Sequence, residues 1–189
     1  SLHAAHHLTA ADIVPLLVLL SLETGLELEC CKTLTIDCLR NASGGTVEIA
    51  YTKLRAHGAE HKTIRVRDGA STTPGGLIRR IIALTAKARV HHASDCLWVY
   101  YQHGEITAGI RHPRMTIDAW TQRHGIVDDA GRPLHLRLSH LRKTHKALWY
   151  LNTEGHIARF AVGHTAEIAA RHYADIPALR PLHEQAVAD

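Results

Sequence analysis

Three residues in the last third of the chain have side chains suited to phosphate chemistry. His164 follows a glycine in the segment FAVGHTAEIAARHYADI, residues 160–176, and Tyr173 stands nine residues after it. Arg142 precedes Tyr173 by 31 residues, near the start of a predicted helix. A tyrosine hydroxyl is a nucleophile, and arginine and histidine N–H groups stabilise negative charge on a phosphate. Together these residues indicate a phosphate site.

Each of these residues also has a simpler structural explanation. If Thr165 caps the last helix, Tyr173 packs into the core and His164 hydrogen-bonds a backbone carbonyl. Arg142 is then a solvated or salt-bridged side chain. Lys53 is predicted at the tip of a hairpin, where it is either solvated or in contact with a phosphate or base edge of a bound duplex. For single residues both interpretations stay open.

Start and stop signals predict two long helices in the first half of the chain. Thr9 and Asp12 form a Thr-x-x-Asp capping pattern before an apolar run, and Gly25 ends that run. We expect this helix to be buried at the centre of the fold. Thr73 as N-cap and Pro74 at the first position begin the second helix. Its outward side chains are expected to be basic: Arg79, Arg80, Lys87 and Arg89.

Alternating apolar residues predict two strands, residues 46–52 and 62–69, which pair as a β-hairpin. The polar segment between them, residues 53–61, is predicted to form the tip and carries Lys53. A short helix over residues 28–35 is expected before the hairpin, ending near Asp37.

The second half of the chain is predicted to be mostly helical. Residues 96–109 are aromatic and β-prone, and we expect an irregular insertion there. Residues 116–125 form a short helix, and residues 128–133 form a turn. Three further helices follow, at residues 138–151, 154–163 and 165–176. The expected fold class is mainly α with a small antiparallel β-hairpin or sheet, an α+β fold.

Length and composition favour one domain with an anionic partner. A chain of 189 residues with a hydrophobic share of 46% can bury one core and is too short for two ordinary domains. We expect a single domain over residues 1–189, with its core at about 9–181 and a tail at 176–189. The longest apolar run, residues 13–22, carries a proline and is too short to span a membrane. The formal net charge of +4 favours a partner such as nucleic acid.

The cysteines and glycines point to no cofactor. Four cysteines lack the regular spacing of a disulfide framework, and we expect free thiols in a reducing cytoplasm. The opening HAAHH together with Cys30, Cys31 and Cys38 could supply zinc ligands, so a zinc-stabilised scaffold is one alternative. The chain has no Cys-x-x-Cys pair to support it. The segments GGTVEIA and TPGG match neither nucleotide-binding loop.

Taken in order, these segments resemble the tyrosine recombinase family, the phage integrases and their relatives, from about Thr9 to Pro181. LRKTHKALWY followed by VGHTAEIAARHY resembles the family's His-x-x-Arg box and then its Gly-His and nucleophilic tyrosine. Earlier, LETGLELECCKTLTIDCL, residues 22–39, resembles a segment that usually reads Thr-Gly-Leu-Arg with an acidic residue soon after. The resemblance therefore covers nearly the whole chain.

The resemblance implies a role for each matching position. The catalytic positions are Tyr173 as nucleophile, Arg142 as second arginine, His164 as late histidine and Lys53 as hairpin lysine. Two positions depart from the pattern, because Glu27 stands at the first arginine and Ser139 at the first histidine. A carboxylate repels phosphate, so activity requires that another cation compensates or that Glu27 points away while anchoring Arg142. The candidate compensating cations are Arg55, Lys62 and Lys32.

The implied activity is site-specific recombination of double-stranded DNA through a 3′-phosphotyrosine intermediate, with no cofactor or metal. The alternative is a DNA-binding protein of the same fold whose catalytic site is weak or silent. Residues expected to contact DNA are Arg55, Lys62, Arg79, Arg80, Lys87 and Lys143. The resemblance further implies a tetramer on DNA, a monomer in isolation, a bacterial cytoplasmic location, and an N-terminal DNA-binding domain that is absent from these residues.

Overall fold

The computed structural model describes residues 6–55, 58–111 and 113–152 of the chain. Two predicted site residues, His164 and Tyr173, lie outside the described residues. The same holds for the two predicted helices after residue 152 and for the tail. The predictions for these segments therefore stay predictions.

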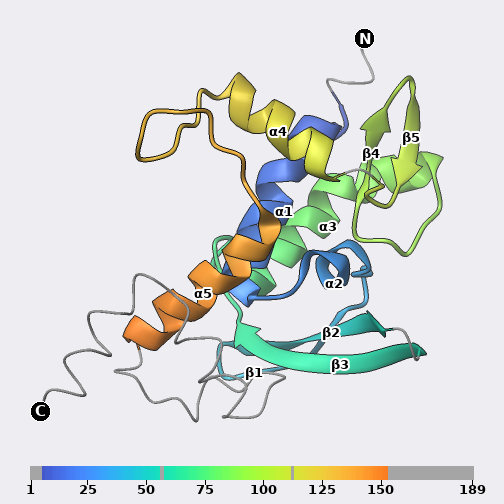
Figure 1. Ribbon diagram of the computed structural model, residues 1–189. Coiled ribbons are helices and arrows are strands. Elements are labelled where there is room, and N and C mark those ends of the chain that lie inside the picture. The colour runs from blue at the N-terminus through green and yellow to red at the C-terminus, as the bar shows by residue number, and fades with distance from the viewer. Residues whose placement is uncertain (1–5, 56–57, 112, 153–189) are drawn as a thin grey trace, which may run out of the picture.

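Helix α1, Ala10–Thr24, is the central element, as its sequence predicts. The Asp12 carboxylate accepts hydrogen bonds from both the backbone N–H and the hydroxyl of Thr9, at 2.8 and 2.7 Å, which fixes the first turn. The helix ends at Gly25, which has the left-handed backbone that glycine adopts at low cost. Figure 1 shows the other helices and the sheet arranged around α1.

The core forms where the apolar side of α1 meets its neighbours. Leu17 and Leu20 of α1 are almost fully buried against residues of the sheet, the next long helix and the segment before the second hairpin. The largest buried side chain is Trp98, whose indole N–H donates to the carbonyl of Cys31 at 2.7 Å. All four cysteines are free thiols, as predicted.

Helix α2, Leu28–Lys32, is shorter than the predicted helix over residues 28–35. The side chains of Cys30 and Cys31 are buried, and the indole N–H of Trp98 donates a hydrogen bond to the Cys31 carbonyl. That carbonyl would otherwise receive the N–H of residue 35 in a continued helix. In its place the Cys31 carbonyl accepts the indole N–H of Trp98, 67 residues away, and the backbone N–H of Leu34 at 3.4 Å.

Three antiparallel strands form one sheet in the order β1-β2-β3. They are β1, Leu39–Ser43, β2, Thr46–Arg55, and β3, Gly58–Arg67. The predicted hairpin is confirmed, but its strands extend further toward the tip than predicted, β3 ends two residues before the predicted end at residue 69, and β1 was not expected. Lys53 lies inside β2, opposite Glu60, so the prediction that it sits at the hairpin tip is wrong. Residues 53–61 lack the regular alternation of polar and apolar side chains that is typical of a strand. The backbone pairing of β2 with β3 nevertheless continues through most of them.

Helix α3, Pro74–His91, begins as predicted. The Thr73 hydroxyl accepts the N–H of Gly76 at 3.2 Å, and Pro74 occupies the first turn. Arg79, Arg80 and Lys87 are exposed, but Arg89 is not directed to solvent as expected. Its guanidinium donates to the carbonyls of Cys96 and Leu97, at 2.6 and 3.0 Å. Arg89 thus ties the end of α3 to the segment that follows.

Residues 96–109 contain a regular hairpin, which corrects the expected irregular insertion. Strands β4, Val99–Gln102, and β5, Glu105–Ala108, pair antiparallel, and the first strand buries Val99 and Tyr100 against the core. Trp98 and Tyr100 of this segment pack inward, whereas Tyr101 stays half-exposed.

Two helices complete the described chain. Helix α4, Pro113–Arg123, and the turn after it agree with the predicted helix and turn at residues 116–133. Helix α5, Leu138–Asn152, packs across α1 and ends near the sheet (Figure 1). Within the described ranges no helix is both long and apolar enough to cross a membrane.

Candidate active site

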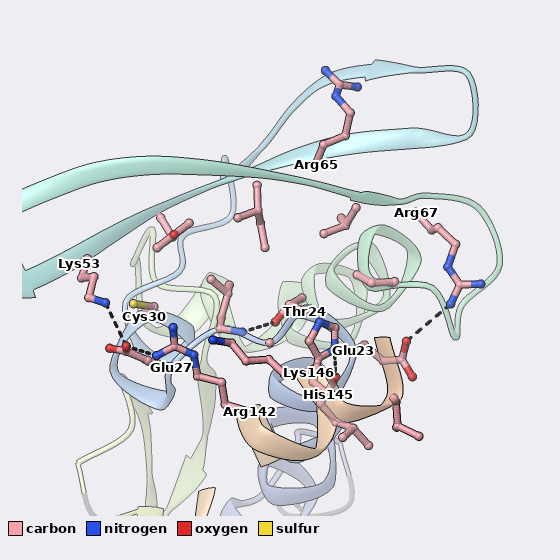
Figure 2. Close-up of a pocket in the computed structure, with 18 of the residues that line it drawn as sticks. Glu23, Thr24, Glu27, Cys30, Lys53, Arg65, Arg67, Arg142, His145 and Lys146 are labelled. Carbon is pink, nitrogen blue, oxygen red and sulfur yellow. Dashed lines mark hydrogen bonds and ion pairs between the residues drawn. The ribbon is translucent and has the colours of Figure 1, made fainter. Parts of the chain in front are cut away.

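A pocket of about 590 Å³ lies between the sheet, the end of α1 and helix α5. Its walls are apolar where β3 contributes Ile64 and Val66 and where the α1–α2 connection contributes Leu26. Its charged end is formed by Glu27, Lys53 and Arg142 (Figure 2). Three segments that are distant in sequence therefore meet at one set of charged groups.

Glu27 is the centre of this charged end. One of its carboxylate oxygens accepts a hydrogen bond from the Lys53 ammonium at 2.9 Å. The same oxygen makes a short charge-assisted contact with the Arg142 guanidinium, 115 residues further along the chain. Burial opposes ionisation of Glu27, but the contacts with Lys53 and Arg142 outweigh it and hold the pKa below its ordinary value. The carboxylate is therefore ionised at neutral pH.

Lys53 reaches Glu27 because of strand alternation. Val47, Ile49, Tyr51 and Lys53 are every second residue of β2, so they share the face that looks into the protein. The first two members are core residues, Tyr51 is half-buried, and Lys53 ends the row with a side chain that is 20% exposed. The alkyl stem continues the apolar face, and the ammonium reaches the carboxylate.

Helix α5 supplies Arg142 and is docked by His145. The His145 ring nitrogen Nδ1 lies 2.6 Å from the carbonyl of Leu22, near the end of α1. Burial lowers the pKa of His145, which favours a neutral ring that donates to this carbonyl from Nδ1. A Cβ on Gly25 would lie 2.5 Å from the His145 ring, so this close approach requires glycine. The contact between His145 and Leu22 therefore fixes the orientation of α5, and with it the side of the helix that faces the pocket.

Lys146 is a pocket residue that the sequence prediction missed. It follows Arg142 by one helical turn, and residues at this spacing share one helix face. Burial and the nearby positive charge of Arg142 lower the pKa of Lys146 to about 8, with Glu27 acting in the opposite direction. The available signal was the spacing of four residues from Arg142.

The proposed compensation for Glu27 is not what the structure shows. Lys32 pairs with Glu29 at 2.9 Å and Lys62 with Glu60 at 3.1 Å, and neither lines the pocket. Glu27 anchors Arg142 as one alternative expected, but it does so while facing the pocket instead of pointing away. The side chain of Arg55 lies outside the description.

Other predicted residues lie apart from this pocket. Ser139 is exposed on the first turn of α5 and is not among the described residues that line the pocket. Arg79 pairs with Asp68 at 2.8 Å on the outside of α3. Arg80, Lys87 and Lys143 are exposed, which leaves them accessible to a partner.

Metal ligation finds no support in the described part of the chain. There, no three His, Cys, Asp or Glu side chains are grouped so that they could hold a metal ion. Cys31 and Cys38 are buried, and burial raises their pKa values to about 12 and about 11. Zinc binds the thiolate, so these two cysteines are poor candidates. They serve as small apolar core residues instead.

No protein-family profile matches the chain, and no curated protein matches its sequence. Its fold, however, is similar to that of a solved site-specific recombinase, and the described helices and small antiparallel sheets confirm the predicted α+β class. The XerH site-specific recombinase bound to its difH substrate, in a pre-cleavage complex, matches with a TM-score of 0.58 and 14% identity. The match covers 96% of this chain and 52% of the XerH chain.

The XerH post-cleavage complex with palindromic difH substrate gives a similar result. Its TM-score is 0.59 at 16% identity, over 95% of this chain and 52% of the XerH chain. The chain thus spans about half the length of these recombinases. At these identities the likeness concerns the fold.

Proposed function

We propose that this protein binds double-stranded DNA and acts on its phosphodiester backbone as a site-specific tyrosine recombinase. The observation that carries the proposal is the convergence of Lys53 and Arg142 on one pocket from elements 89 residues apart, in a recombinase fold. The solved recombinases of this fold were captured with DNA substrates. Two cations facing one pocket are what an incoming phosphate requires.

In the proposed reaction, the Tyr173 hydroxyl loses its proton to solvent water and attacks the phosphorus. The bond to the 5′-oxygen breaks, and the product is a 3′-phosphotyrosine and a strand with a 5′-hydroxyl. Arg142 and His164 stabilise the extra negative charge of the transition state, and Lys53 protonates the leaving 5′-oxygen. A 5′-hydroxyl from another strand reverses the step, so bond energy is conserved and no cofactor is consumed.

Glu27 supports a second candidate function, DNA binding with little or no chemistry. Its carboxylate already forms ion pairs with Lys53 and Arg142. An incoming phosphate must therefore displace the carboxylate or share the two cations with it. Losing one transition-state donor costs roughly 10²- to 10³-fold in rate. The two candidates agree on duplex binding and differ on the covalent intermediate.

The deciding experiment uses a nicked duplex of candidate target sequence, which traps the covalent product because the cleaved fragment diffuses away. Wild type and Tyr173→Phe are compared on a denaturing gel, after duplex binding of both has been verified. A protein–DNA band present in wild type and absent in Tyr173→Phe supports the recombinase. With binding intact, no band in either protein supports the DNA-binding candidate.

The proposal includes assembly and location. We expect the free protein to be a monomer and the DNA-bound protein to be a tetramer in which the tail, residues 176–189, docks on a neighbour. The expected location is the bacterial cytoplasm, at the nucleoid when DNA is bound. Light scattering with and without duplex tests the assembly, and a tail-truncated variant that still forms the tetramer contradicts the role of the tail.

A further inference from the structure

Among the described residues, the charged end of the pocket has three cationic side chains and one carboxylate. Glu27 faces Lys53 and Arg142, and Lys146 lies within electrostatic range of all three. Figure 2 shows Lys146 extending from α5 beside Arg142, toward the same region as Glu27. These four groups carry a net positive charge, so the site attracts an anion even with Glu27 in place.

Other described cations near the pocket lie away from its charged end. Arg65 alternates to the outer face of β3, where it pairs with Glu48 at 2.6 Å. Arg67 faces Glu23 at the other end of the pocket, 3.8 Å away. Lys32 and Lys62, two of the three cations expected to compensate for Glu27, do not line the pocket. Among the described pocket residues, Lys146 is the cation that joins Lys53 and Arg142 at the charged end.

We propose that Lys146 is a phosphate-binding residue of this site and takes the place of the cation missing at position 27. This role of Lys146 rests on the proposed function, since the phosphate is that of a DNA backbone. Lys146 and Arg142 share one face of α5, so they bind adjacent oxygens of one phosphate. Lys53 approaches from β2, opposite α5, and Glu27 is released from its two partners as the phosphate enters.

The protonation of Lys146 fits this role. Its pKa of about 8 in the free protein reflects burial and the charge of Arg142. An anion at the charged end favours the ammonium form and raises that pKa. Burial raises the pKa of the pocket residues Cys30 and Tyr51 and lowers that of His145. Glu27 has a lowered pKa and stays ionised.

The test measures binding of a fluorescent duplex of random sequence at several salt concentrations. Lys146→Met keeps the alkyl packing and removes the charge, and Lys32→Met is the matched control, because Lys32 is a lysine of α2 outside the pocket. We expect Lys146→Met to lower affinity roughly tenfold. We also expect it to reduce the salt slope by about 0.9, the value for one phosphate contact. Lys146→Arg should restore both, and Lys32→Met should change the slope by less.

Each outcome bears on one claim. Wild-type binding with an unchanged affinity and slope in Lys146→Met overturns the role of Lys146 and leaves the proposed function standing. Weakened binding in both Lys146→Met and Lys146→Arg indicates a structural role for the residue and also overturns the inference. A wild-type protein that does not bind duplex overturns the proposed function itself.

A second readout covers the case in which Lys146→Met does not fold. Wild type should lose duplex affinity as the pH rises above about 8, the pKa of Lys146 in the free protein, because the DNA-bound state then has to take up a proton that the free state lacks. Lys146→Arg stays charged across this range, so its affinity should stay flat. Superimposable pH profiles for the two proteins contradict the inference.

Discussion

The core around α1 and the pocket beneath the sheet are built from the same elements but are held together by different interactions. In the core, Leu17, Leu20 and Trp98 are almost fully buried, and apolar contacts hold the elements together. In the pocket, the same sheet and helices are joined through Glu27 and its two cations, with side chains that keep 20–38% of their surface exposed. Buried apolar contacts determine stability, whereas partly exposed ion pairs contribute little to it and are available to a ligand.

The largest effect is expected in the core, from Trp98→Ala. Removing this buried indole should lower the free energy of unfolding by about 3–5 kcal/mol, measured by urea denaturation. Trp98→Phe keeps most of the ring but leaves the Cys31 carbonyl without its indole partner, so we expect a smaller loss of about 1–3 kcal/mol. Val90→Ala, at a residue 83% exposed, is the control and should stay within about 0.5 kcal/mol of wild type.

Gly25→Ala tests the junction between the two regions. The positive φ of 67° costs an alanine about 1–2 kcal/mol, and the new Cβ would also meet the His145 ring. We expect lower stability together with weaker duplex binding, because α5 carries Arg142 and Lys146. Gly125→Ala is the control, with a φ of 59° and open space around its Cβ. Equal losses in the two variants would mean that the contact with His145 does not matter.

The sequence predicted the core better than the pocket, and the reason is the range of the contacts. The capping of α1 by Asp12 and of α3 by Thr73 depends on residues three positions apart. The pocket depends on pairs such as Glu27 with Arg142, which only the fold brings together.

The resemblance to recombinases nevertheless selected three of the pocket residues, Glu27, Lys53 and Arg142. It missed Lys146, because its pattern assigns no role to that position. The polarity pattern, for its part, placed Lys53 at the hairpin tip, because polarity alone does not show how far a backbone ladder continues. The roles of His164 and Tyr173 remain predictions.

Glu27→Gln should affect the two properties in opposite directions. Without the carboxylate charge, Lys53 and Arg142 lose their counter-ion, and we expect stability to fall by about 1 kcal/mol. The same change removes a repulsion against phosphate, so duplex affinity should rise by roughly fivefold to tenfold. Anisotropy titrations and urea denaturation on the same preparations measure both. Glu29→Gln, which changes an exposed carboxylate of α2 two residues after Glu27, should raise affinity much less.

The smallest effect is the acid dependence of stability that Glu27 contributes. Its folded-state pKa lies below the ordinary value of 4.5, so the unfolded chain binds the proton more tightly than the folded protein. The stabilisation is therefore complete above pH 4.5 and is lost as the pH falls through the lower folded-state value. Wild type should lose more unfolding free energy between neutral pH and that acid range than Glu27→Gln does. Because burial of Glu27 raises its pKa and so offsets part of the effect of its two cations, the difference should be modest. Parallel pH profiles for the two proteins would show that the ion pairs of the pocket do not stabilise the fold, and that Lys53 and Arg142 are held in place by the packing of β2 and α5 alone.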